Sequence, residues 1–331
     1  MKLEDSKLLS VRNLRVIFRT YRGIVKALNG VNFEIGREEF VGIVGETGCG
    51  KSVTALSIMR LIQQPGEIID GEIIFDGTDL LKLSEDDMRK VRGKEIAMIF
   101  QEPKVSLNPV LKVGTQLKEA VSIADGIPQK SREAEEKVMD ILDAVGLPDP
   151  KGLMNKYPHE LSGGMAQRVM IAMGLLKKPK LLIADEPTSA LDVTIQAQIL
   201  NLIKDLVSKF RTSVLFITHD LGVVAEYSDR VVIMYAGNVV EIGDVYTIFR
   251  NPVHPYTKGL LNAVPRIGQR EPLETIPGIV PDLVHPPSGC RFHPRCSKAM
   301  EVCSKEFPEM VEVEKDHFVA CHLFTRGEKN G

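Results

Sequence analysis

A glycine-rich segment near the N-terminus has the residue types and the spacing needed to hold phosphate. Its glycines let backbone N–H groups turn toward phosphate oxygens, and a following helix would add the positive end of its dipole. Lys51 would reach the β- and γ-phosphates of a nucleotide, and the Ser52 hydroxyl would bind Mg²⁺. Cys49 occupies a position that the pattern leaves open, so we interpret it as a small filler rather than a reactive thiol. The segment matches the pattern G-x-x-x-x-G-K-[ST] and consists of Gly45, Glu46, Thr47, Gly48, Cys49, Gly50, Lys51 and Ser52.

Two carboxylates farther along the chain could complete a phosphoryl-transfer site. Asp185 and Glu186 follow the apolar run 181–184, which has the pattern of a buried strand. At the carboxyl edge of a parallel sheet, Asp185 would hold Mg²⁺, directly or through water, and Glu186 would polarise the attacking water as general base. An apolar run ending in Asp-Glu is common by itself, but here a phosphate-binding segment precedes it. Together the two motifs predict a P-loop nucleoside triphosphatase.

Alternating strand and helix patterns surround these motifs. Short apolar or alternating runs predict strands, and apolar residues at helical spacing predict helices. Strands that alternate with helices favour a largely parallel sheet covered on both faces, an α/β fold. The predicted strands are residues 8–18, 31–35, 40–44, 71–75, 96–100, 181–184, 214–218 and 231–234, and the predicted helices are 52–62, 131–145 and 194–210.

The composition of the 331-residue chain limits the classes of function. With 44% apolar residues it can bury a substantial core, and its formal net charge of −2 gives no general attraction to nucleic acid or to anionic membranes. Residues 1–10 contain the acidic Glu4 and Asp5 and lack the apolar run of a signal peptide. No run of about 18 apolar residues occurs. We therefore expect a cytoplasmic chain that depends on other subunits for any membrane-spanning helices.

A further set of motifs resembles the ATPase cassettes of ABC transporters. Residues 161–165 read Leu-Ser-Gly-Gly-Met and, with Gln167 and Arg168 after them, are similar to the ABC signature loop. Gln101, at the end of a predicted strand, resembles the Q-loop glutamine of this family. Two more segments continue the family's order of motifs over about residues 8–250, namely 189–192 (Ser-Ala-Leu-Asp), similar to the D-loop, and His219, similar to the switch histidine.

The resemblance implies a fold with four parts. It is a P-loop NTPase with a RecA-like core, an antiparallel β subdomain, an inserted helical subdomain and a small cysteine-containing C-terminal domain. The expected boundaries are 1–101 and 166–250 for the core with its β subdomain, 102–165 for the helical subdomain with the signature loop, and 251–331 for the C-terminal domain.

The resemblance also implies that ATP lies between two chains. In this family two cassettes pack head to tail, so the phosphate loop of one chain and the signature loop of the other hold each nucleotide. Ser162 and Gly164 would therefore contact the ATP of the partner chain, and Asp192 of the D-loop would lie at the ATP site. A single chain is then expected to bind ATP but to hydrolyse it poorly.

Three further contacts follow from the same resemblance. His219 would contact the γ-phosphate, and Gln101 would couple Mg²⁺ and the attacking water to the transmembrane partners. The adenine would stack on an aromatic residue after the first strand. Tyr21 is the expected residue, with Phe18 as the alternative.

Several segments resemble the ATPases of dipeptide and oligopeptide importers in particular. Those ATPases work as two related subunits, or as two copies in isolation, beneath two permease proteins, and an extracytoplasmic binding protein delivers the peptide. The resemblance implies ATP-driven peptide uptake at the cytoplasmic face of the membrane, with nickel or oligosaccharide as alternative substrates and no role for nucleic acid. A soluble ABC-type ATPase is less favoured, because the chain has one signature loop and no heptad insertion. The segments are 100–103 (Phe-Gln-Glu-Pro), 106–109 (Ser-Leu-Asn-Pro), 254–257 (His-Pro-Tyr-Thr), 276–278 (Ile-Pro-Gly) and 290–296 (Cys-Arg-Phe-His-Pro-Arg-Cys).

Four cysteines near the C-terminus have the spacing C-x₅-C-x₆-C-x₁₇-C. Structural disulfides are rare in a reducing cytosol, so a metal site or free thiols are the favoured readings. Four thiolates suit either tetrahedral Zn²⁺ or a [4Fe–4S] cluster, and the spacing does not decide between them. The importer resemblance implies a [4Fe–4S] cluster that would stiffen the tail. The four residues are Cys290, Cys296, Cys303 and Cys321.

Overall fold

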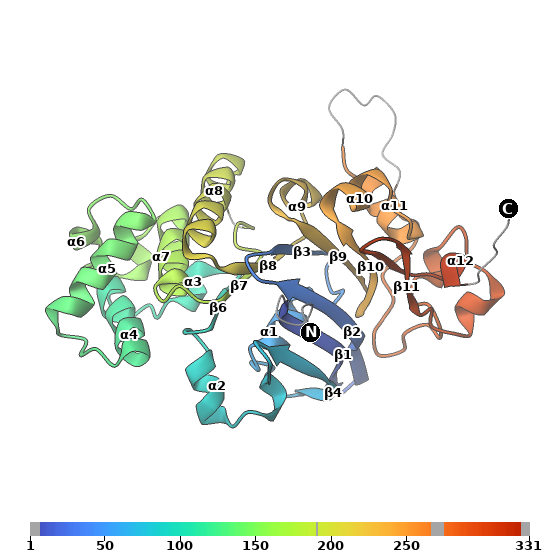
Figure 1. Ribbon diagram of the computed structural model, residues 1–331, viewed down its shortest axis with the longest axis horizontal. Coiled ribbons are helices and arrows are strands. Elements are labelled where there is room, and N and C mark those ends of the chain that lie inside the picture. Colours follow the sequence, from blue (N-terminus) through green and yellow to red (C-terminus); the bar gives the residue numbers. More distant parts are fainter. Residues whose placement is uncertain (1–6, 190, 266–274, 326–331) are drawn as a thin grey trace. The chain divides into compact units, whose positions relative to one another are not determined.

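The computed structural model describes residues 7–189, 191–265 and 275–325, which form two compact units (Figure 1). The helix-rich unit contains residues 7–8, 36–39 and 82–216, and the strand-rich unit contains residues 9–35, 40–81 and 217–325. Glu4, Asp5 and Ala190 lie outside the described residues. Within the described ranges, no helix has the length and apolar character needed to cross a bilayer.

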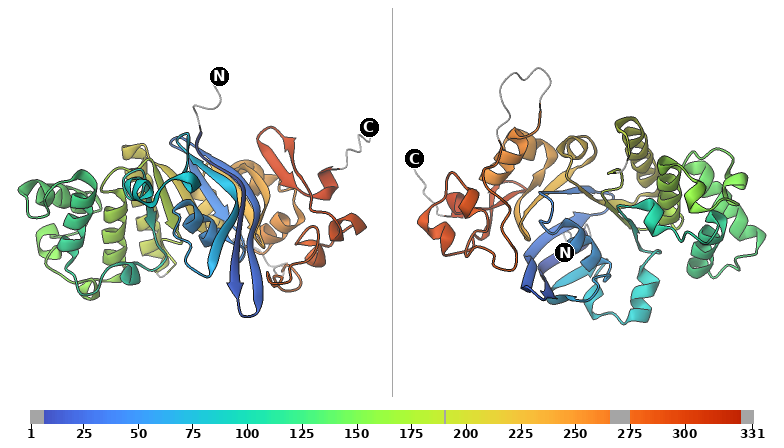
Figure 2. Two further views of the ribbon diagram at one scale, coloured as in Figure 1. Left: turned by 90° about the horizontal axis from the view of Figure 1, so that it is seen from below. Right: turned by 180° about the vertical axis from the view of Figure 1, so that it is seen from behind.

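Two sets of strands build the strand-rich unit. They are β1 (Lys7–Thr20), β2 (Gly23–Gly36), β3 (Phe40–Val44), β4 (Gly66–Phe75), β5 (Thr78–Asp79), β9 (Arg230–Tyr235), β10 (Asn238–Asp244), β11 (Met310–Glu314) and β12 (His317–Ala320). One set has the order β2-β1-β4-β5 and the other the order β11-β12-β10-β9-β3. The pair β3·β9 is parallel, whereas β9·β10, β10·β12 and β11·β12 are antiparallel. In Figure 2 the β1–β2 hairpin lies beside β4, with which β1 pairs antiparallel.

Short helices connect and cover the strands of this unit. They are α1 (Lys51–Ile58), α9 (Leu221–Tyr227), α10 (Val245–Arg250), α11 (Pro255–Asn262) and α12 (His322–Thr325), with the 3₁₀ turns η1 (Leu80–Lys82), η3 (His293–Arg295) and η4 (Glu301–Ser304). Three aromatic rings join the C-terminal region to the parallel strands. Tyr235 of β9 lies 4.6 Å from Tyr256 of α11 and 5.1 Å from Phe292, measured between ring centroids. All three rings are buried, so the C-terminal region is part of the apolar core of this unit.

The helix-rich unit combines three strands with a group of helices. Its elements are α2 (Glu85–Val91), β6 (Ile96–Ile99), α3 (Pro103–Ser106), α4 (Val113–Asp125), α5 (Arg132–Ala144), α6 (Pro150–Leu153), η2 (Pro158–Glu160), α7 (Gly163–Leu175), β7 (Leu181–Asp185), α8 (Val193–Phe210) and β8 (Ser213–Thr218). The strands have the order β8-β7-β6, and β6 pairs with β7 in parallel. Figure 1 shows α4, α5, α6 and α7 grouped together, and α5 packs against the other three.

Helix α5 illustrates how local sequence fixes these elements. The Ser131 hydroxyl accepts a hydrogen bond from the Ala134 N–H and caps the N-terminus, and Glu133 lies in the first turn, where the helix dipole favours an acid. Gly146, with a positive φ of 66°, follows the last turn. Its buried side chains recur at helical spacing and form one apolar face, which consists of Ala134, Val138, Ile141 and Leu142.

The strands and helices predicted from the sequence are all present. The first helix is shorter than predicted, because it ends at Ile58 and Arg60 takes a left-handed conformation with φ of 50°. The prediction of a parallel sheet is correct for β3·β9 and β6·β7. Strands β10, β12 and β11 were not predicted, and they extend the sheet beyond β9 as antiparallel strands in that order.

Candidate functional site

The glycine-rich segment forms a tight turn between β3 and α1. A Cβ atom at Gly45 would lie 2.1 Å from the carbonyl oxygen of Met234, so no side chain fits at this position. Gly48 and Gly50 have φ values of 81° and 108°, which favour glycine because a Cβ atom would be strained there. The chain therefore needs glycine at these positions to make the turn that precedes α1.

Lys51 is held inside this loop. Its side chain is 6% exposed, and its ammonium group donates hydrogen bonds to the carbonyl oxygens of Gly45 at 2.7 Å and Glu46 at 3.3 Å. Burial raises the pKa of the neighbouring Cys49 thiol, and this keeps the thiol in its protonated, unreactive form. The loop thus presents one buried cation among backbone groups, an arrangement suited to phosphate.

The C-terminal region holds the loop at Glu46. The Glu46 N–H donates a hydrogen bond to the hydroxyl oxygen of Tyr256 over 2.9 Å. The Glu46 carboxylate accepts two hydrogen bonds from Arg295, at 2.7 Å and 3.1 Å. In the sequence, Tyr256 and Arg295 stand out only as parts of segments that resemble importer ATPases. Nothing in their spacing indicates that they contact Glu46.

His219 and the two aromatic candidates also belong to the strand-rich unit. His219 is exposed and precedes Asp220, whose carboxylate caps α9. Tyr21 lies in the turn between β1 and β2 with 92% of its surface exposed, and the guanidinium of Arg22 lies 5.6 Å from its ring centroid. Phe18 is half-buried in β1. Of the two rings, Tyr21 offers the more open surface for stacking.

The acidic pair lies at the end of β7 in the helix-rich unit. Asp185 is the last residue of the strand and is 6% exposed, and Glu186 has a left-handed φ of 44°. A non-glycine residue in this region costs about 1–3 kcal/mol and is concentrated at functional sites. The Glu186 carboxylate accepts a hydrogen bond from the side-chain amide of Gln101 over 3.1 Å.

The signature-like segment contributes helix caps in the same unit. The Ser162 hydroxyl accepts a hydrogen bond from the Met165 N–H at 3.3 Å and caps α7. Gly164 packs tightly, since a Cβ atom there would lie 3.2 Å from Cγ2 of Ile195. Asp192 caps α8 by accepting hydrogen bonds from the N–H groups of residues 194 and 195. Ser162 and Asp192 therefore each have a structural task besides any contact with nucleotide.

A cavity of about 370 Å³ in the helix-rich unit brings several of these motifs together. Gln167 is 1% exposed, and its side-chain nitrogen has no hydrogen-bond partner among the described residues. Residues from the Q-loop, signature and D-loop motifs all line this cavity. Its lining consists of Gln101, Glu102, Pro103, Gly163, Gln167, Pro187, Ser189 and Leu191.

The four C-terminal cysteines are unpaired thiols, and two of them, Cys303 and Cys321, are buried. Burial, with a smaller contribution from the neighbouring thiols, raises the pKa of Cys290 to about 12 and that of Cys321 to about 11. The Cys290 N–H donates to the Cys303 carbonyl oxygen at 2.8 Å. Within the described ranges, however, no three His, Cys, Asp or Glu side chains lie close enough together to hold a metal ion. The donor atoms suit a thiolate-bound metal, but their arrangement is not that of a formed site.

Two models of known protein families match the chain. Residues 28–189 match the model of the family "ABC transporter", and residues 240–303 match that of "Oligopeptide/dipeptide transporter, C-terminal region". The chain is 53% identical over 95% of its length to a probable peptide ABC transporter ATP-binding protein of Sinorhizobium fredii, of which it covers 94%. It is 52% identical over 96% of its length to the oligopeptide transport ATP-binding protein OppD of Bacillus subtilis, covering 89% of that protein.

Solved structures with the same fold are ABC cassettes. The ATP-binding cassette MJ0796, solved as a dimer in a post-hydrolysis state with ADP and Pi, is 28% identical with a TM-score of 0.65, over 72% of this chain and 99% of that one. The cbiO1 protein of Clostridium perfringens, part of an ABC transporter complex, is also 28% identical, with a TM-score of 0.61 over 74% of this chain and 92% of that one. The resemblance to importer ATPases seen in the motifs is confirmed, and the chain belongs to the ABC transporter ATPases, in the oligopeptide and dipeptide transporter branch.

Proposed function

We propose that this chain is the ATP-hydrolysing subunit of an importer that takes up dipeptides or oligopeptides through separate permease subunits. The observation that carries the proposal is the match over 95% of the chain to a probable peptide transporter ATPase, together with the matching C-terminal region. A B. subtilis relative, 50% identical over 96% of this chain, is a dipeptide transport ATP-binding protein. Nickel or oligosaccharide remains the alternative substrate class.

The proposed reaction is attack of water on the γ-phosphorus of ATP. Lys51 stabilises the β- and γ-phosphates, and Glu186 accepts a proton from the attacking water. The hydrogen bond from Gln101 to Glu186 supports this role, because it orients the carboxylate that must receive the proton. His219 would contact the γ-phosphate, and Tyr21 would stack on the adenine.

Magnesium would be bound by oxygen atoms of the chain. Ser52, Gln101 and Asp185 supply hydroxyl, amide and carboxylate oxygens, which are the ligands that Mg²⁺ prefers. The bound ion would neutralise charge on the phosphates. Asp185 is 6% exposed, and this burial would keep its carboxylate in a fixed orientation.

Hydrolysis would need a second cassette. Ser162 and Gly164 lie at the start of α7, whose thirteen residues give a helix dipole able to stabilise a partner's phosphate. A related cassette solved as a dimer supports such pairing. The second chain would be a related ATPase subunit, with a second copy as the alternative, and Asp192 of the D-loop would lie near the shared nucleotide.

The remaining partners are membrane proteins. Two permeases would form the path across the bilayer, and an extracytoplasmic binding protein would deliver the peptide to them. The ATPase would then lie on the cytoplasmic face of the membrane, with the part 102–165 nearest the permeases and the parts 1–101 and 166–250 binding nucleotide. The part 251–331 would form the C-terminal domain of the importer branch.

The four cysteines Cys290, Cys296, Cys303 and Cys321 would hold a [4Fe–4S] cluster, with Zn²⁺ as the alternative. The mutual proximity of the thiols supports this, although they must move closer to reach ligand distances. The group would stiffen the tail. Measuring iron, sulfide and zinc in anaerobically purified protein distinguishes the cluster from Zn²⁺. Protein that contains neither metal would show that the four cysteines are free thiols.

Uptake by the assembled transporter tests the proposed function. The chain is co-expressed with its permeases and partner ATPase, reconstituted in vesicles and supplied with ATP and labelled dipeptide or pentapeptide. ATP-dependent accumulation of peptide is expected. Accumulation of nickel or oligosaccharide instead would contradict peptide import, and purification of the chain with ribosomes rather than permeases would contradict a transport role altogether.

A further inference from the structure

The segment between the first two cysteines of the tail is docked firmly on the strand-rich unit. Phe292 is 3% exposed and packs on Tyr235 and Tyr256. Arg291 is 5% exposed and donates to the carbonyl oxygens of Lys26, at 3.1 Å, and Ala236. The position of this segment is therefore defined by both apolar packing and hydrogen bonds.

Arg295 extends from this segment to the phosphate loop. Its side chain is 6% exposed, and its guanidinium makes a two-pronged contact with the Glu46 carboxylate. Further hydrogen bonds run to the carbonyl oxygen of Pro277 at 2.8 Å and to the hydroxyl of Tyr235 at 3.4 Å. A planar guanidinium with this many partners has one orientation, and the two-pronged geometry passes that orientation to the carboxylate.

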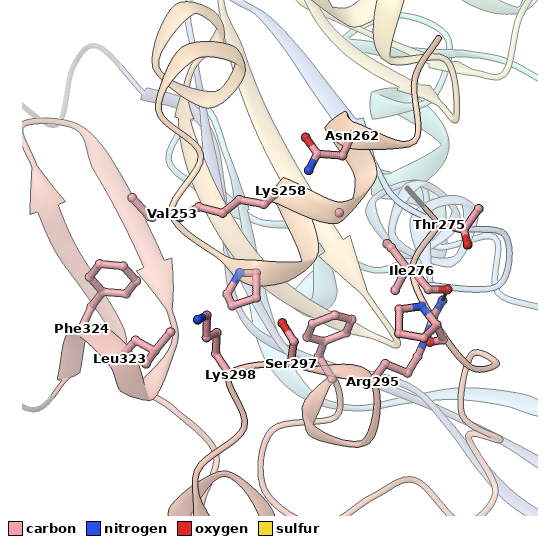
Figure 3. Close-up of a pocket in the computed structure, with 14 residues that line it drawn as sticks. Val253, Lys258, Asn262, Thr275, Ile276, Arg295, Ser297, Lys298, Leu323 and Phe324 are labelled. Atoms are coloured by element: carbon pink, nitrogen blue, oxygen red, sulfur yellow. Dashed lines mark hydrogen bonds between the residues drawn. The ribbon is translucent and has the colours of Figure 1, made fainter. Parts of the chain in front are cut away.

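Hydrogen bonds orient the guanidinium of Arg295 at the edge of a cavity. The residue borders a cavity of about 480 Å³, in which Leu323 and Phe324 lie on the side opposite Arg295 and Ile276 (Figure 3). The side chain of Arg295 is nevertheless only 6% exposed, so its hydrogen bonds to Glu46, Pro277 and Tyr235 are largely shielded from water. These bonds fix the orientation of the guanidinium.

Glu46 connects the C-terminal region to Lys51, the cation of the phosphate loop. The Glu46 N–H is bonded to Tyr256 and its carboxylate to Arg295, so both ends of the residue are fixed by the C-terminal region. The carbonyl oxygens of Gly45 and Glu46 in turn accept hydrogen bonds from the Lys51 ammonium group. The orientation of these peptide groups thus depends on Arg295 and Tyr256, and it sets the position of Lys51.

We propose that Arg295 is a positioning residue for the phosphate loop, through which the cysteine-bearing tail sets the affinity for ATP. This inference rests on the proposed binding of ATP by that loop. Arg295 touches no substrate and acts through Glu46. Since pre-organisation of the loop would aid the ground state and the transition state equally, its loss raises KM and leaves kcat almost unchanged.

Titration of the full chain with a fluorescent ATP analogue, together with the KM and kcat of the vesicle-reconstituted transporter, tests the proposal. Arg295→Gln is expected to weaken binding about tenfold, as for loss of a charge-assisted pair that acts through one residue. Glu46→Gln should weaken ATP binding by a similar factor. The double variant should bind ATP no more weakly than either single variant. Tyr256→Phe, which keeps the ring, should have a smaller effect in the same direction.

Arg291→Gln is the matched control, because Arg291 docks the same segment without touching Glu46. It should keep the affinity within about twofold while lowering the melting temperature. Circular dichroism checks that each variant is folded. Arg295→Lys, which keeps the positive charge, should recover part of the affinity for ATP that Arg295→Gln loses. Folded Arg295→Gln with wild-type affinity, additive effects in the double variant, or an equal loss in Arg291→Gln would overturn the proposal. Failure of the wild-type chain to bind ATP would instead overturn the proposed function.

Discussion

The side-chain amide of Gln101 donates a hydrogen bond to the carboxylate of Glu186 over 3.1 Å. Gln101 lies two residues beyond the end of β6, and Glu186 directly follows β7, which pairs with β6 in parallel. Two parallel neighbours end at the same edge of a sheet, so side chains just beyond their ends meet there. The contact links the residue expected to respond to the permeases with the residue expected to activate water.

Removal of this contact is expected to slow hydrolysis. Gln101→Ala should lower the kcat of the reconstituted transporter about tenfold, because an unoriented carboxylate is a poorer base. Gln198→Ala, on an exposed position of α8, is the control and should leave kcat unchanged. Equal rates for both variants and the wild type would show that the Gln101–Glu186 contact has no part in the reaction.

Gly45→Ala is expected to disrupt the phosphate loop. The new Cβ atom would lie 2.1 Å from the Met234 carbonyl oxygen, and overpacking of this kind costs about 1–3 kcal/mol. If the loop shifts to relieve the clash, ATP binding should weaken about tenfold or more, as measured by equilibrium titration.

Gly174→Ala provides the matched control for that change. Its Cβ atom would make ordinary contacts, 3.6 Å from Ile99 and 3.7 Å from Leu182, in the last turn of α7. Alanine is favoured over glycine in a helix by up to about 1 kcal/mol, so the variant should be as stable as the wild type or more stable. Unchanged ATP affinity in Gly45→Ala would be incompatible with the loop geometry.

His254, a buried histidine of the C-terminal region, should make stability depend on pH. Burial lowers the pKa of His254 to about 3, and its Nδ1 accepts a hydrogen bond from the Tyr256 N–H. Between about pH 6.5 and 3 the unfolded chain binds a proton that the folded chain does not. The free energy of unfolding should therefore fall as the pH decreases through this window, by at most about 1.4 kcal/mol per pH unit for one group.

His254→Asn isolates this contribution. Asparagine can still cap α11 but does not titrate, so urea unfolding at several pH values should give a flatter profile below about pH 6.5 than the wild type. Carboxylates that titrate in both proteins cancel in the comparison. Parallel profiles would mean that His254 takes up its proton over the same pH range in the folded chain as in the unfolded chain.

Replacement of a tail cysteine should remove the proposed metal. Cys296→Ser is expected to abolish the iron or zinc content and to lower the melting temperature, because the tail would lose a cross-link. Cys49→Ser serves as the control, since Cys49 lies in the phosphate loop and should leave the metal content unchanged. Full metal content in Cys296→Ser would remove this residue from the ligand set.

The sequence was sufficient to predict the elements that carry the motifs. β3 and β7 are continuous apolar runs ended by functional residues, and α8 has a clear cap in Asp192, so local pattern and structure agree. It did not predict β10, β11 and β12. The pairing of β12 with β10 joins residues more than seventy positions apart, and alternation within a strand contains no information about its partner.

The contact between Arg295 and Glu46 was beyond prediction for the same reason. The two residues are separated by 249 positions, and each lies in a motif with its own interpretation. Glu46 occupies the second position of the phosphate loop, which the motif leaves unspecified. Only the folded chain shows that Glu46 is hydrogen-bonded to the C-terminal region. The capping of α7 by Ser162 was likewise not predicted, because Ser162 was interpreted only as part of the signature loop.

The most direct test of the central claim is the rate of ATP hydrolysis by the vesicle-reconstituted transporter containing Glu186→Gln. The amide keeps the size of the side chain but cannot accept the proton from water. We expect a kcat lower by roughly 10²–10⁴-fold, with ATP affinity within about threefold of the wild type and no peptide uptake. Hydrolysis of ATP by the variant at the wild-type rate would show that Glu186 is not the general base.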